Sequence, residues 1–237
     1  MNLKIIYEDK NIMVIEKTAG IVVFPEGKSK TNTLADYLIK EYPELKKAGK
    51  PPRYGIVHRL DKDTSGILLI AKNNSSLSFL QKQFKERKVI KKYLALVAGI
   101  VKKDSGKIET LMGRSPKNRK KQRVFLEGEP KSENKRRAIT LYKVIDRFKN
   151  CTFLEVEPKT GRKHQIRCHL AWIHHPIIGD KLYGFKNQLN FNLNRHFLHA
   201  SYLKITLPTG EEKEFRSDLP SELKNIIKTL RENDQGN

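Results

Sequence analysis

The sequence predicts an α+β fold, in which a mixed, largely antiparallel β-sheet forms the core and helices flank it. The predicted strands come in adjacent pairs rather than in strict alternation with helices, which argues against a doubly wound parallel sheet. The chain has 237 residues, a length that suits one domain with a sizeable core. Because no internal repeat or low-complexity linker divides it, we expect a single domain over 1–237.

The first elements are a hairpin, a helix and a buried strand. Residues 4–7 and 12–16 are rich in β-formers and flank a polar turn, which predicts paired strands. Thr33 can cap a helix that ends near Pro43 and has apolar positions at i, i+3 and i+4 spacing. The apolar run 67–71 predicts a strand.

The middle of the chain predicts a second helix and three strands. Asn74 or Ser75 can cap the helix, whose apolar face is Leu77, Leu80 and Phe84. Residues 91–99 are apolar on both strand faces, which indicates a strand covered on both sides. Residues 138–144 and 151–156 return to strand-like alternation around a polar turn at Asp146–Asn150.

The C-terminal part predicts two helices and a strand. One helix runs from Lys163 to about His174, is ended by Pro176, and has the apolar stripe Ile166, Leu170 and Ile173. A strand follows at 202–207. The last helix starts at about Pro220 and buries Leu223, Ile226, Ile227 and Leu230.

The charge of the chain is lopsided. Lys and Arg number 48 against 26 Asp and Glu, a formal net charge of +22. Such an excess repels itself in a compact protein, so a polyanionic partner is the natural reason to keep it, with nucleic acid ahead of an anionic membrane. No apolar run approaches the roughly 20 residues that span a bilayer, and the N-terminus lacks the pattern of a signal peptide.

Cysteine and histidine usage predicts neither a disulfide framework nor a metal site. Cys151 and Cys168 have no CxxC spacing, which fits a reducing compartment and predicts an intracellular, cytoplasmic protein. His164 and His169 are five positions apart and do not share a helix face as a ligand pair would. We therefore expect no metal among the candidate ligands His58, His164, Cys168, His169, His174 and His175.

The segment 114–137 is strongly basic and contributes little to a core. Its ten basic and three acidic residues predict an exposed loop or a two-stranded arm. A solvated loop explains this composition as well as an RNA-contacting arm does. If the arm binds RNA, the contacts are expected from Arg119, Lys120, Lys121 and Arg123.

The run His58–Gly66 carries the most specific signal. It places Asp61 after a cationic and an apolar residue and before a turn-forming Thr-Ser-Gly, with a buried strand next. A lone aspartate near a turn is usually a capping or solvated residue. The run, however, closely resembles the signature of the RluA-type pseudouridine synthases, which isomerise uridine in RNA.

Four further segments resemble the same family in the same order and spacing. Lys91–Gly99 is similar to its KxYxAxVxG strand, and 160–170 to its TGRxHQIRxH segment. Residues 179–184 and 195–200 look like its two later blocks. Together the segments cover nearly the whole chain, so the resemblance is stronger than any one motif would make it.

The resemblance has two departures. Thr18 stands where the family usually has a proline, and Phe24 stands where a histidine is common. Both lie outside the proposed chemistry. The chain starts almost directly at the catalytic block, so we expect the catalytic domain without the N-terminal S4 RNA-binding domain of some relatives.

The resemblance implies the pseudouridine synthase catalytic fold and an isomerase acting on specific uridines of structured ribosomal or transfer RNA. It gives Asp61 the role of catalytic carboxylate, Tyr93 that of a stacking platform for the base, and Arg167 that of ion-pair partner to Asp61. The residues alone leave Tyr93 as a core tyrosine and Arg167 as a surface arginine. The isomerisation needs no redox change or group donor, so no cofactor is implied.

A uridine cannot react inside a helical stack, so the base must be flipped out. Arg59, next to the proposed active site, could fill the space of the extruded base or bind the phosphate backbone. Further RNA contacts are expected from His58, Arg162, Lys163 and His164.

Two other functions remain open from the residues. One is a non-catalytic RNA-binding or ribosome-assembly protein, against which the intact set of Asp61, Tyr93 and Arg167 argues. The other is a carboxylate-dependent hydrolase acting on a nucleoside or sugar, against which the charge of +22 argues. We expect a monomer that binds structured RNA and no membrane.

Overall fold

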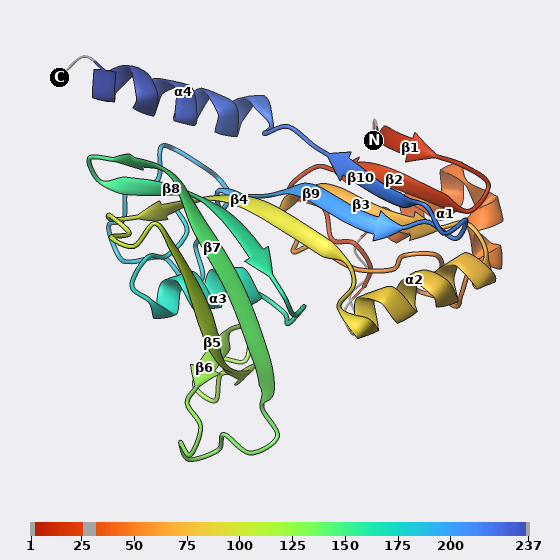
Figure 1. Cartoon of the computed structure of the whole chain (residues 1–237), viewed down its shortest axis with the longest axis horizontal. Helices are drawn as coiled ribbons and strands as arrows, with labels where there is room; N and C mark the ends of the chain where they lie inside the picture. The colour runs from red at the N-terminus through yellow and green to blue at the C-terminus, as the bar shows by residue number, and fades with distance from the viewer. Residues whose placement is uncertain (1–2, 26–31, 236–237) are drawn as a thin grey trace. The chain divides into compact units, whose positions relative to one another are not determined.

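The computed structural model describes residues 3–25 and 32–235 (Figure 1). The chain forms two compact units, and each is described by itself. Unit 1 comprises residues 1–90 and 200–218, and unit 2 comprises residues 91–199 and 219–237. Among the residues that the structure describes, no helix has the length and apolarity that a bilayer crossing needs. The count of one domain stays a prediction.

The strands of unit 1 begin with the predicted hairpin. β1 (Lys4–Glu8) pairs antiparallel with β2 (Ile12–Lys17), and β2 pairs antiparallel with β3 (Ser65–Ala71). β9 (Leu198–Thr206) enters unit 1 at Ala200, lies next to β3, and pairs antiparallel with β10 (Glu212–Arg216). The hairpin and the strands β3 and β9 confirm the sequence predictions, whereas β10 was not predicted.

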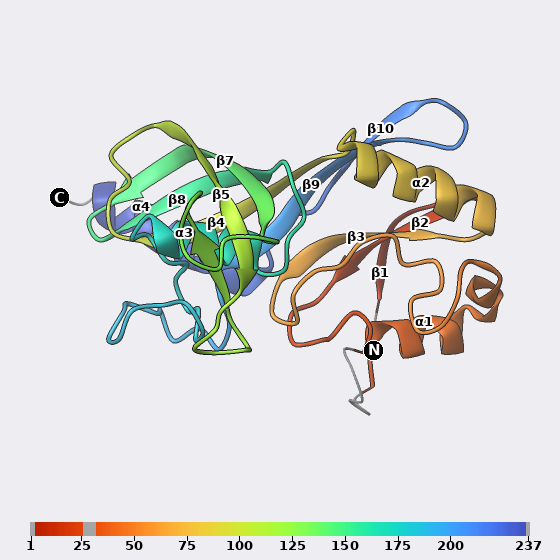
Figure 2. The same cartoon turned by 90° about the horizontal axis from the view of Figure 1, so that it is seen from below.

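Two helices cover opposite faces of this sheet, as Figure 2 shows. α1 (Leu34–Glu41) is capped by Thr33 as predicted, and a short 3-10 helix (Pro43–Lys47) follows it. The predicted caps of α2 (Asn74–Glu86), Asn74 or Ser75, are wrong by one and two residues. The cap is Asn73, which keeps an extended backbone and whose side chain accepts a hydrogen bond from the Ser76 N–H over 2.8 Å.

The strands of unit 2 lie in the order β4, β8, β7, β5, β6. They are β4 (Ile90–Ala98), β8 (Cys151–Pro158), β7 (Arg136–Phe148), β5 (Ser105–Arg114) and β6 (Gln122–Phe125), and their printed pairings are antiparallel. The predicted turn at 146–150 is wrong in extent. β7 runs on to Phe148 through an irregularity of register near Asp146, so only two residues connect it to β8.

Unit 2 also contains the other two helices. α3 (Gln165–Trp172) is shorter at both ends than the predicted Lys163–His174 helix, because His164 has the left-handed φ of 54° and ends the helix on that side. α4 (Ser221–Gln235) agrees with its prediction. α3 packs against β6, β7 and β8, and α4 packs against β7.

Each unit has its own apolar core. In unit 1, residues such as Ile12, Leu69 and Leu203 pack together and α2 adds Leu80. In unit 2, β4, β8, α3 and α4 meet around a cluster that includes Leu96, Leu154, Leu170, Phe197 and Leu223. The predicted α+β class with a largely antiparallel sheet is confirmed.

Candidate active site

The loop that carries Asp61 is fixed through its main chain. The ammonium group of Lys17, on a side chain only 1% exposed, donates hydrogen bonds to the carbonyl groups of Thr18 (2.8 Å), Ile21 (2.9 Å) and Lys62 (2.9 Å). The Lys62 carbonyl also accepts from the N–H of Gly20 over 2.9 Å. Lys62 follows Asp61 directly, so these bonds hold the aspartate's backbone at a defined place while its side chain stays partly exposed.

The loop leads at once into a strand that is buried throughout. The N–H of Thr64 donates to the Asp61 carbonyl over 3.1 Å, which closes the turn, and β3 starts at Ser65. Gly66 has φ +116°, and a Cβ placed there would lie 2.2 Å from the carbonyl oxygen of Ala200. Only glycine fits this crossing, so the Thr-Ser-Gly sequence lets β3 and β9 approach closely.

The two residues before the loop contact aromatic rings of unit 1. The Nε2 of His58 accepts a hydrogen bond from the Leu69 N–H over 3.1 Å, and its ring stacks on Phe84 with centroids 5.0 Å apart. The guanidinium carbon of Arg59 lies 4.9 Å from the centroid of the Phe24 ring. His58 is therefore part of the fold, and the RNA contact expected of it stays a prediction.

Arg167 is buried rather than on the surface, so the surface alternative is wrong. Its side chain is only 8% exposed and pairs with Asp180 through two bonds, Nε to Oδ2 (2.7 Å) and Nη2 to Oδ1 (2.9 Å). The Oδ1 of Asp180 also accepts from the N–H groups of Leu182 and Tyr183. Asp180 lies in the segment 179–184 that resembles the family, but no role was predicted for it from the sequence.

Asp180 stays ionised in this setting. Burial favours the neutral acid, but the hydrogen bonds and positive charge of Arg167 outweigh it and hold the pKa of Asp180 below its ordinary value. A guanidinium carries five N–H donors, and the Asp180 pair uses two of them.

Tyr183 connects Arg167 to the arm. The guanidinium carbon of Arg167 lies 5.2 Å from its ring centroid, and its hydroxyl accepts from the Gln122 N–H over 2.7 Å. The same hydroxyl is 3.2 Å from the Nδ1 of His164, which packs edge-on against the ring. Burial raises the pKa of Tyr183, so it stays a neutral phenol. The structure thus brings His164 and Arg167 together around a residue that sequence reasoning missed.

Gln165 anchors the turn before α3 to β7. Its Oε1 accepts from the Thr160 hydroxyl (2.7 Å) and the Arg162 N–H (3.0 Å), and its Nε2 donates to the Ile139 carbonyl and the Thr140 hydroxyl. The oxygen and the nitrogen of this buried amide therefore each have two hydrogen-bond partners. The Nε of Arg162 donates to the Arg137 carbonyl over 3.2 Å, and Lys163 is exposed.

His169 lies inside the same unit between two threonines. Its Nδ1 is 2.8 Å from the Thr140 hydroxyl and its Nε2 is 3.0 Å from the Thr110 hydroxyl. Burial lowers the pKa of His169 to about 4, so the ring is neutral near pH 7. Within residues 3–25 and 32–235, no group of three or more His, Cys, Asp and Glu side chains is placed to hold a metal ion.

Tyr93 lies on β4, opposite Val156 of β8, and packs beside the core of unit 2. It is partly exposed. Asp61 lies in unit 1, whereas Tyr93 and Arg167 lie in unit 2. The predicted Arg167–Asp61 ion pair therefore stays a prediction.

The basic segment 114–137 forms the β5–β6 hairpin and the loop from β6 to β7. Arg119 and Lys120 are exposed in the β5–β6 turn, and Lys121 lies 5.7 Å from the Tyr183 ring centroid. Arg123 lies over the Phe125 ring at 4.8 Å and pairs with Glu129. The turn of the arm therefore presents exposed positive charge, and the RNA contacts expected of it stay a prediction.

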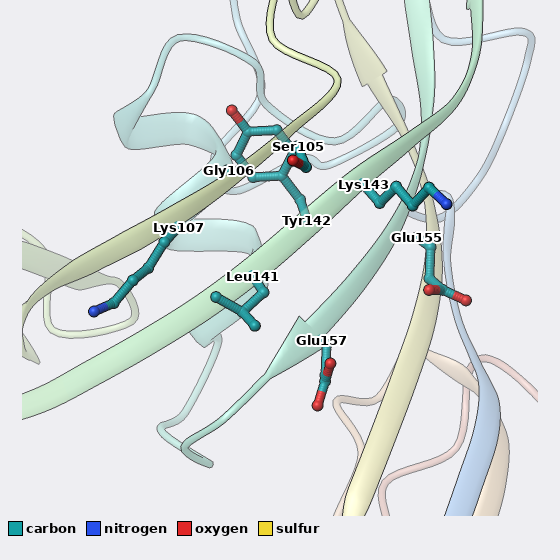
Figure 3. A pocket seen from close by; sticks show the side chains of 8 residues that line it. All are labelled: Ser105, Gly106, Lys107, Leu141, Tyr142, Lys143, Glu155 and Glu157. Atoms are coloured by element: carbon teal, nitrogen blue, oxygen red, sulfur yellow. The ribbon is translucent and has the colours of Figure 1, made fainter.

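A cleft of about 340 Å³ lies elsewhere on unit 2, on the sheet formed by β5, β7 and β8. It includes neither Tyr93 nor Arg167. Its walls mix cationic and anionic side chains, which favours no single kind of ligand. The lining residues, shown in Figure 3, are Ser105, Gly106, Lys107, Leu141, Tyr142, Lys143, Glu155 and Glu157.

Comparison with known families shows which family the chain belongs to. The model of the RNA pseudouridylate synthase family matches residues 11–172, which include Asp61, Tyr93 and Arg167. The chain belongs to the RNA pseudouridylate synthase family. As the resemblance to the RluA type implied, it is an isomerase of uridine in RNA.

The sequence similarity to named relatives extends along almost the whole chain. The chain is 41% identical over 239 residues to an uncharacterized RNA pseudouridine synthase of Aquifex aeolicus, and this covers 97% of the chain and 73% of the relative. It is 38% identical over 234 residues to the uncharacterized RNA pseudouridine synthase YlyB of Bacillus subtilis, covering 98% and 74%. It is 38% identical over 242 residues to ribosomal large subunit pseudouridine synthase D of Neisseria meningitidis serogroup B, covering 98% and 62%.

Solved structures show the same fold. Human RNA pseudouridylate synthase domain containing 1 is 28% identical with a TM-score of 0.76, and the match covers 97% of this chain and 95% of that one. Human RNA pseudouridylate synthase domain containing 4 is 26% identical with a TM-score of 0.77, covering 96% and 93%. The pseudouridine synthase catalytic fold expected from the sequence is confirmed.

Proposed function

We propose that this pseudouridine synthase converts specific uridines of structured RNA with Asp61 as the catalytic carboxylate, after the base has been flipped out of its stack. The observation that carries this assignment is the fixed backbone position of Asp61. The carbonyl of the next residue, Lys62, accepts a hydrogen bond from the buried ammonium group of Lys17 over 2.9 Å. A carboxylate on a fixed backbone and with a partly exposed side chain suits a reaction that needs precise placement.

The chemistry needs few groups. The N1–C1′ bond of uridine breaks, the base turns, and a C5–C1′ bond forms; the proton leaves C5 and N1 gains one. Positive charge that develops at the anomeric carbon is stabilised by a carboxylate, as in glycoside hydrolysis. Tyr93 supplies a stacking surface for the base. Arg167, aligned by Asp180, would hold Asp61 ionised by pairing with it.

The proposed substrate is ribosomal RNA of the large subunit. The name of the Neisseria meningitidis relative points to this class, and the net charge of +22 fits a large polyanion. Transfer RNA is the second candidate. We further propose that the protein works in the cytoplasm as a monomer and contacts RNA through Arg59, Arg162, Lys163, His164 and the turn of the basic arm.

The test uses ribosomal RNA and transfer RNA transcribed without pseudouridine. Wild-type protein is expected to form pseudouridine at few sites, and Asp61→Asn is expected to lose at least about a thousandfold in rate, as catalytic carboxylates do. Asp234→Asn, which changes an exposed carboxylate of α4, is the matched control. Equal activity of wild type and Asp61→Asn would falsify the role of Asp61.

The ion pair is tested separately. Arg167→Met and Arg167→Lys are both expected to slow the reaction. Lys should retain more activity because it keeps the charge, although it loses the bidentate geometry. Urea unfolding of each variant checks that the protein is folded, since either change weakens the buried pair with Asp180. Unchanged turnover in Arg167→Met would contradict the pair. RNA binding without pseudouridine formation by the wild type would favour the non-catalytic alternative.

A further inference from the structure

Tyr183 makes contacts through its backbone, its ring and its hydroxyl group, all within unit 2. Its N–H donates to the Oδ1 of Asp180 over 3.0 Å, and the same oxygen pairs with Arg167. The centroid of its ring lies 5.2 Å from the guanidinium carbon of Arg167. Its hydroxyl accepts from the N–H of Gln122 over 2.7 Å. One residue thus contacts both the proposed partner of Asp61 and the first residue of β6.

Gln122 is connected directly to the exposed turn of the basic arm. It follows Lys121, whose N–H donates to the Asn118 carbonyl over 2.9 Å and whose carbonyl accepts from the Ser115 N–H over 3.0 Å. These bonds close the turn that carries the exposed pair Arg119–Lys120. Because the turn is short and hydrogen-bonded, a displacement of its exposed residues moves the N–H group that Tyr183 accepts from.

The ring of Tyr183 also packs between the arm and α3. It lies against a small apolar cluster that takes one residue from each of β5, β6, β7 and α3, namely Met112, Val124, Ala138 and Cys168. β6 contacts α3 as well (Figure 1). Since close-packed groups transmit displacement to their neighbours, the ring does not turn independently of the arm.

Two constraints act on the guanidinium group of Arg167. Asp180 holds it by hydrogen bonds of 2.7 and 2.9 Å, and the ring of Tyr183 adds a cation–π contact. Both come from the same turn, in which the Gly184 N–H donates to the Asp180 carbonyl over 2.8 Å. A charge that must meet a reacting group at a defined place gains from such alignment. The position of the ring therefore matters for the orientation of the guanidinium group.

We propose that Tyr183 is a positioning residue that couples the basic arm to Arg167. RNA held by the turn of the arm fixes β6, the bond from Gln122 fixes the ring, and the ring aligns the guanidinium group. The proposal rests on the proposed function for two roles, the contact of the arm with RNA and the pairing of Arg167 with Asp61. Its consequence is that RNA bound by the arm raises the rate of isomerisation as well as the affinity.

The test separates the rate of isomerisation from RNA binding. Single-turnover rates are measured over a range of protein concentrations on the RNA transcript that the wild type modifies. Tyr183→Phe keeps the ring but removes the hydroxyl, and it is expected to lower the rate at saturating protein at least about fivefold, with the half-saturating concentration nearly unchanged. Tyr183→Leu removes the ring too and should lower the rate further. An unchanged saturated rate in Tyr183→Phe would overturn the proposal, and urea unfolding checks that each variant is folded.

Two double-mutant cycles test the route of the coupling. Arg119→Gln together with Lys120→Gln removes charge from the turn, and in the wild type this change is expected to lower the saturated rate and raise the half-saturating concentration. In Tyr183→Phe only the second effect should remain, so an equal fall in rate in both backgrounds would contradict coupling. Tyr183→Phe should add no further loss to Arg167→Met. Additive losses would mean that Tyr183 does not act through Arg167.

Tyr7→Phe is the matched control. The hydroxyl of Tyr7 donates to Asp9 over 2.9 Å and the ammonium of Lys213 lies 4.0 Å from its ring centroid, but this residue belongs to unit 1. Its saturated rate is expected to equal that of the wild type, and the same fall in Tyr7→Phe and Tyr183→Phe would refute a specific role for Tyr183. The role of Asp61 is scored by Asp61→Asn alone, so failure of the proposed function and failure of the coupling give different results.

Discussion

The ammonium group of Lys17 donates a hydrogen bond to the main-chain carbonyl of Lys62 over 2.9 Å, and so the end of β2 holds the residue next to Asp61. A lysine so fully buried is rare unless its charge is compensated. Here the partners are carbonyl dipoles, and the Lys62 oxygen accepts from Gly20 as well. The position of the candidate carboxylate thus depends on a side chain forty-four residues earlier in the chain.

Lys17→Met tests this dependence. The variant keeps nearly the same side-chain length but removes the ammonium donor from three carbonyl groups, of which that of Lys62 still accepts from the Gly20 N–H. We expect a loss of about 2–3 kcal/mol in the free energy of unfolding, measured by urea denaturation, and a fall in pseudouridine formation beyond what unfolding explains. Lys62→Met is the control, because it removes an exposed side chain and keeps the accepting carbonyl; it should stay within about 0.5 kcal/mol of the wild type.

Gly66→Ala tests the close approach of β3 and β9. The new Cβ would lie 2.2 Å from the Ala200 carbonyl oxygen at a φ of +116°. We expect a loss above about 4 kcal/mol or failure to fold. Gly20→Ala has a comparable φ of +87° but nothing within 4 Å, so it should cost only about 1–2 kcal/mol of backbone strain. Similar melting temperatures for the two variants would show that the backbone contact does not matter.

The sequence predicted those elements whose apolar pattern is strong. β3 is buried at every position and was found from its apolar run, whereas β5 and β10 were missed. β5 buries Ile108, Thr110 and Met112 on one face, and the polar Thr110 breaks the apolar alternation while serving as a partner of His169. β10 buries only Phe215. A strand whose inward positions are polar or few gives little periodic signal.

The candidate site shows a similar limit. Family motifs located Asp61, Tyr93 and Arg167, but not the carboxylate that the structure pairs with Arg167. Asp180 comes 13 positions later, beyond the end of α3, and no helical or strand period connects the two residues. The pairing depends on how the chain turns back after Pro176. Periodicity likewise did not reveal that His164 adopts a left-handed backbone and so falls outside the helix.

Asp180→Asn tests the alignment of Arg167. The amide keeps the shape of the carboxylate but leaves a buried guanidinium without its counter-charge, and removing one member of a buried pair costs about 3–5 kcal/mol. We expect a loss near the lower end of this range, because Asn can still accept one hydrogen bond, together with slower isomerisation. Unfolding by urea and the rate of pseudouridine formation measure the two effects.

Glu222→Gln is the matched control for that variant. Arg195 is as buried as Arg167, and its Nε donates to Glu222 over 2.7 Å, but the Glu222 side chain is 55% exposed. An exposed partner contributes little, so the variant should lose less than about 1 kcal/mol. If both substitutions cost the same, burial of the Asp180 pair is not what makes it important.

The lowered pKa of the buried His169 makes the free energy of unfolding depend on pH. Its pKa falls from 6.5 to about 4 on folding because the ring is buried. Between these values the unfolded chain binds a proton that the folded chain does not, so stability falls as the pH drops through 6.5. Each pKa unit corresponds to about 1.4 kcal/mol, so the full loss is about 3 kcal/mol near pH 4.

The measurement is urea unfolding of wild type and His169→Gln from pH 7.5 to 4. Gln can still bond with Thr110 and Thr140 but does not titrate, so the stability advantage of the wild type should shrink by about 3 kcal/mol as the pH falls across this range. Other titrating groups are common to both proteins and cancel in the difference. His174→Gln removes an exposed histidine instead. An advantage over His169→Gln that stays constant with pH, or that declines equally for both variants, would show that the buried ring between the threonines is not the acid-sensitive element.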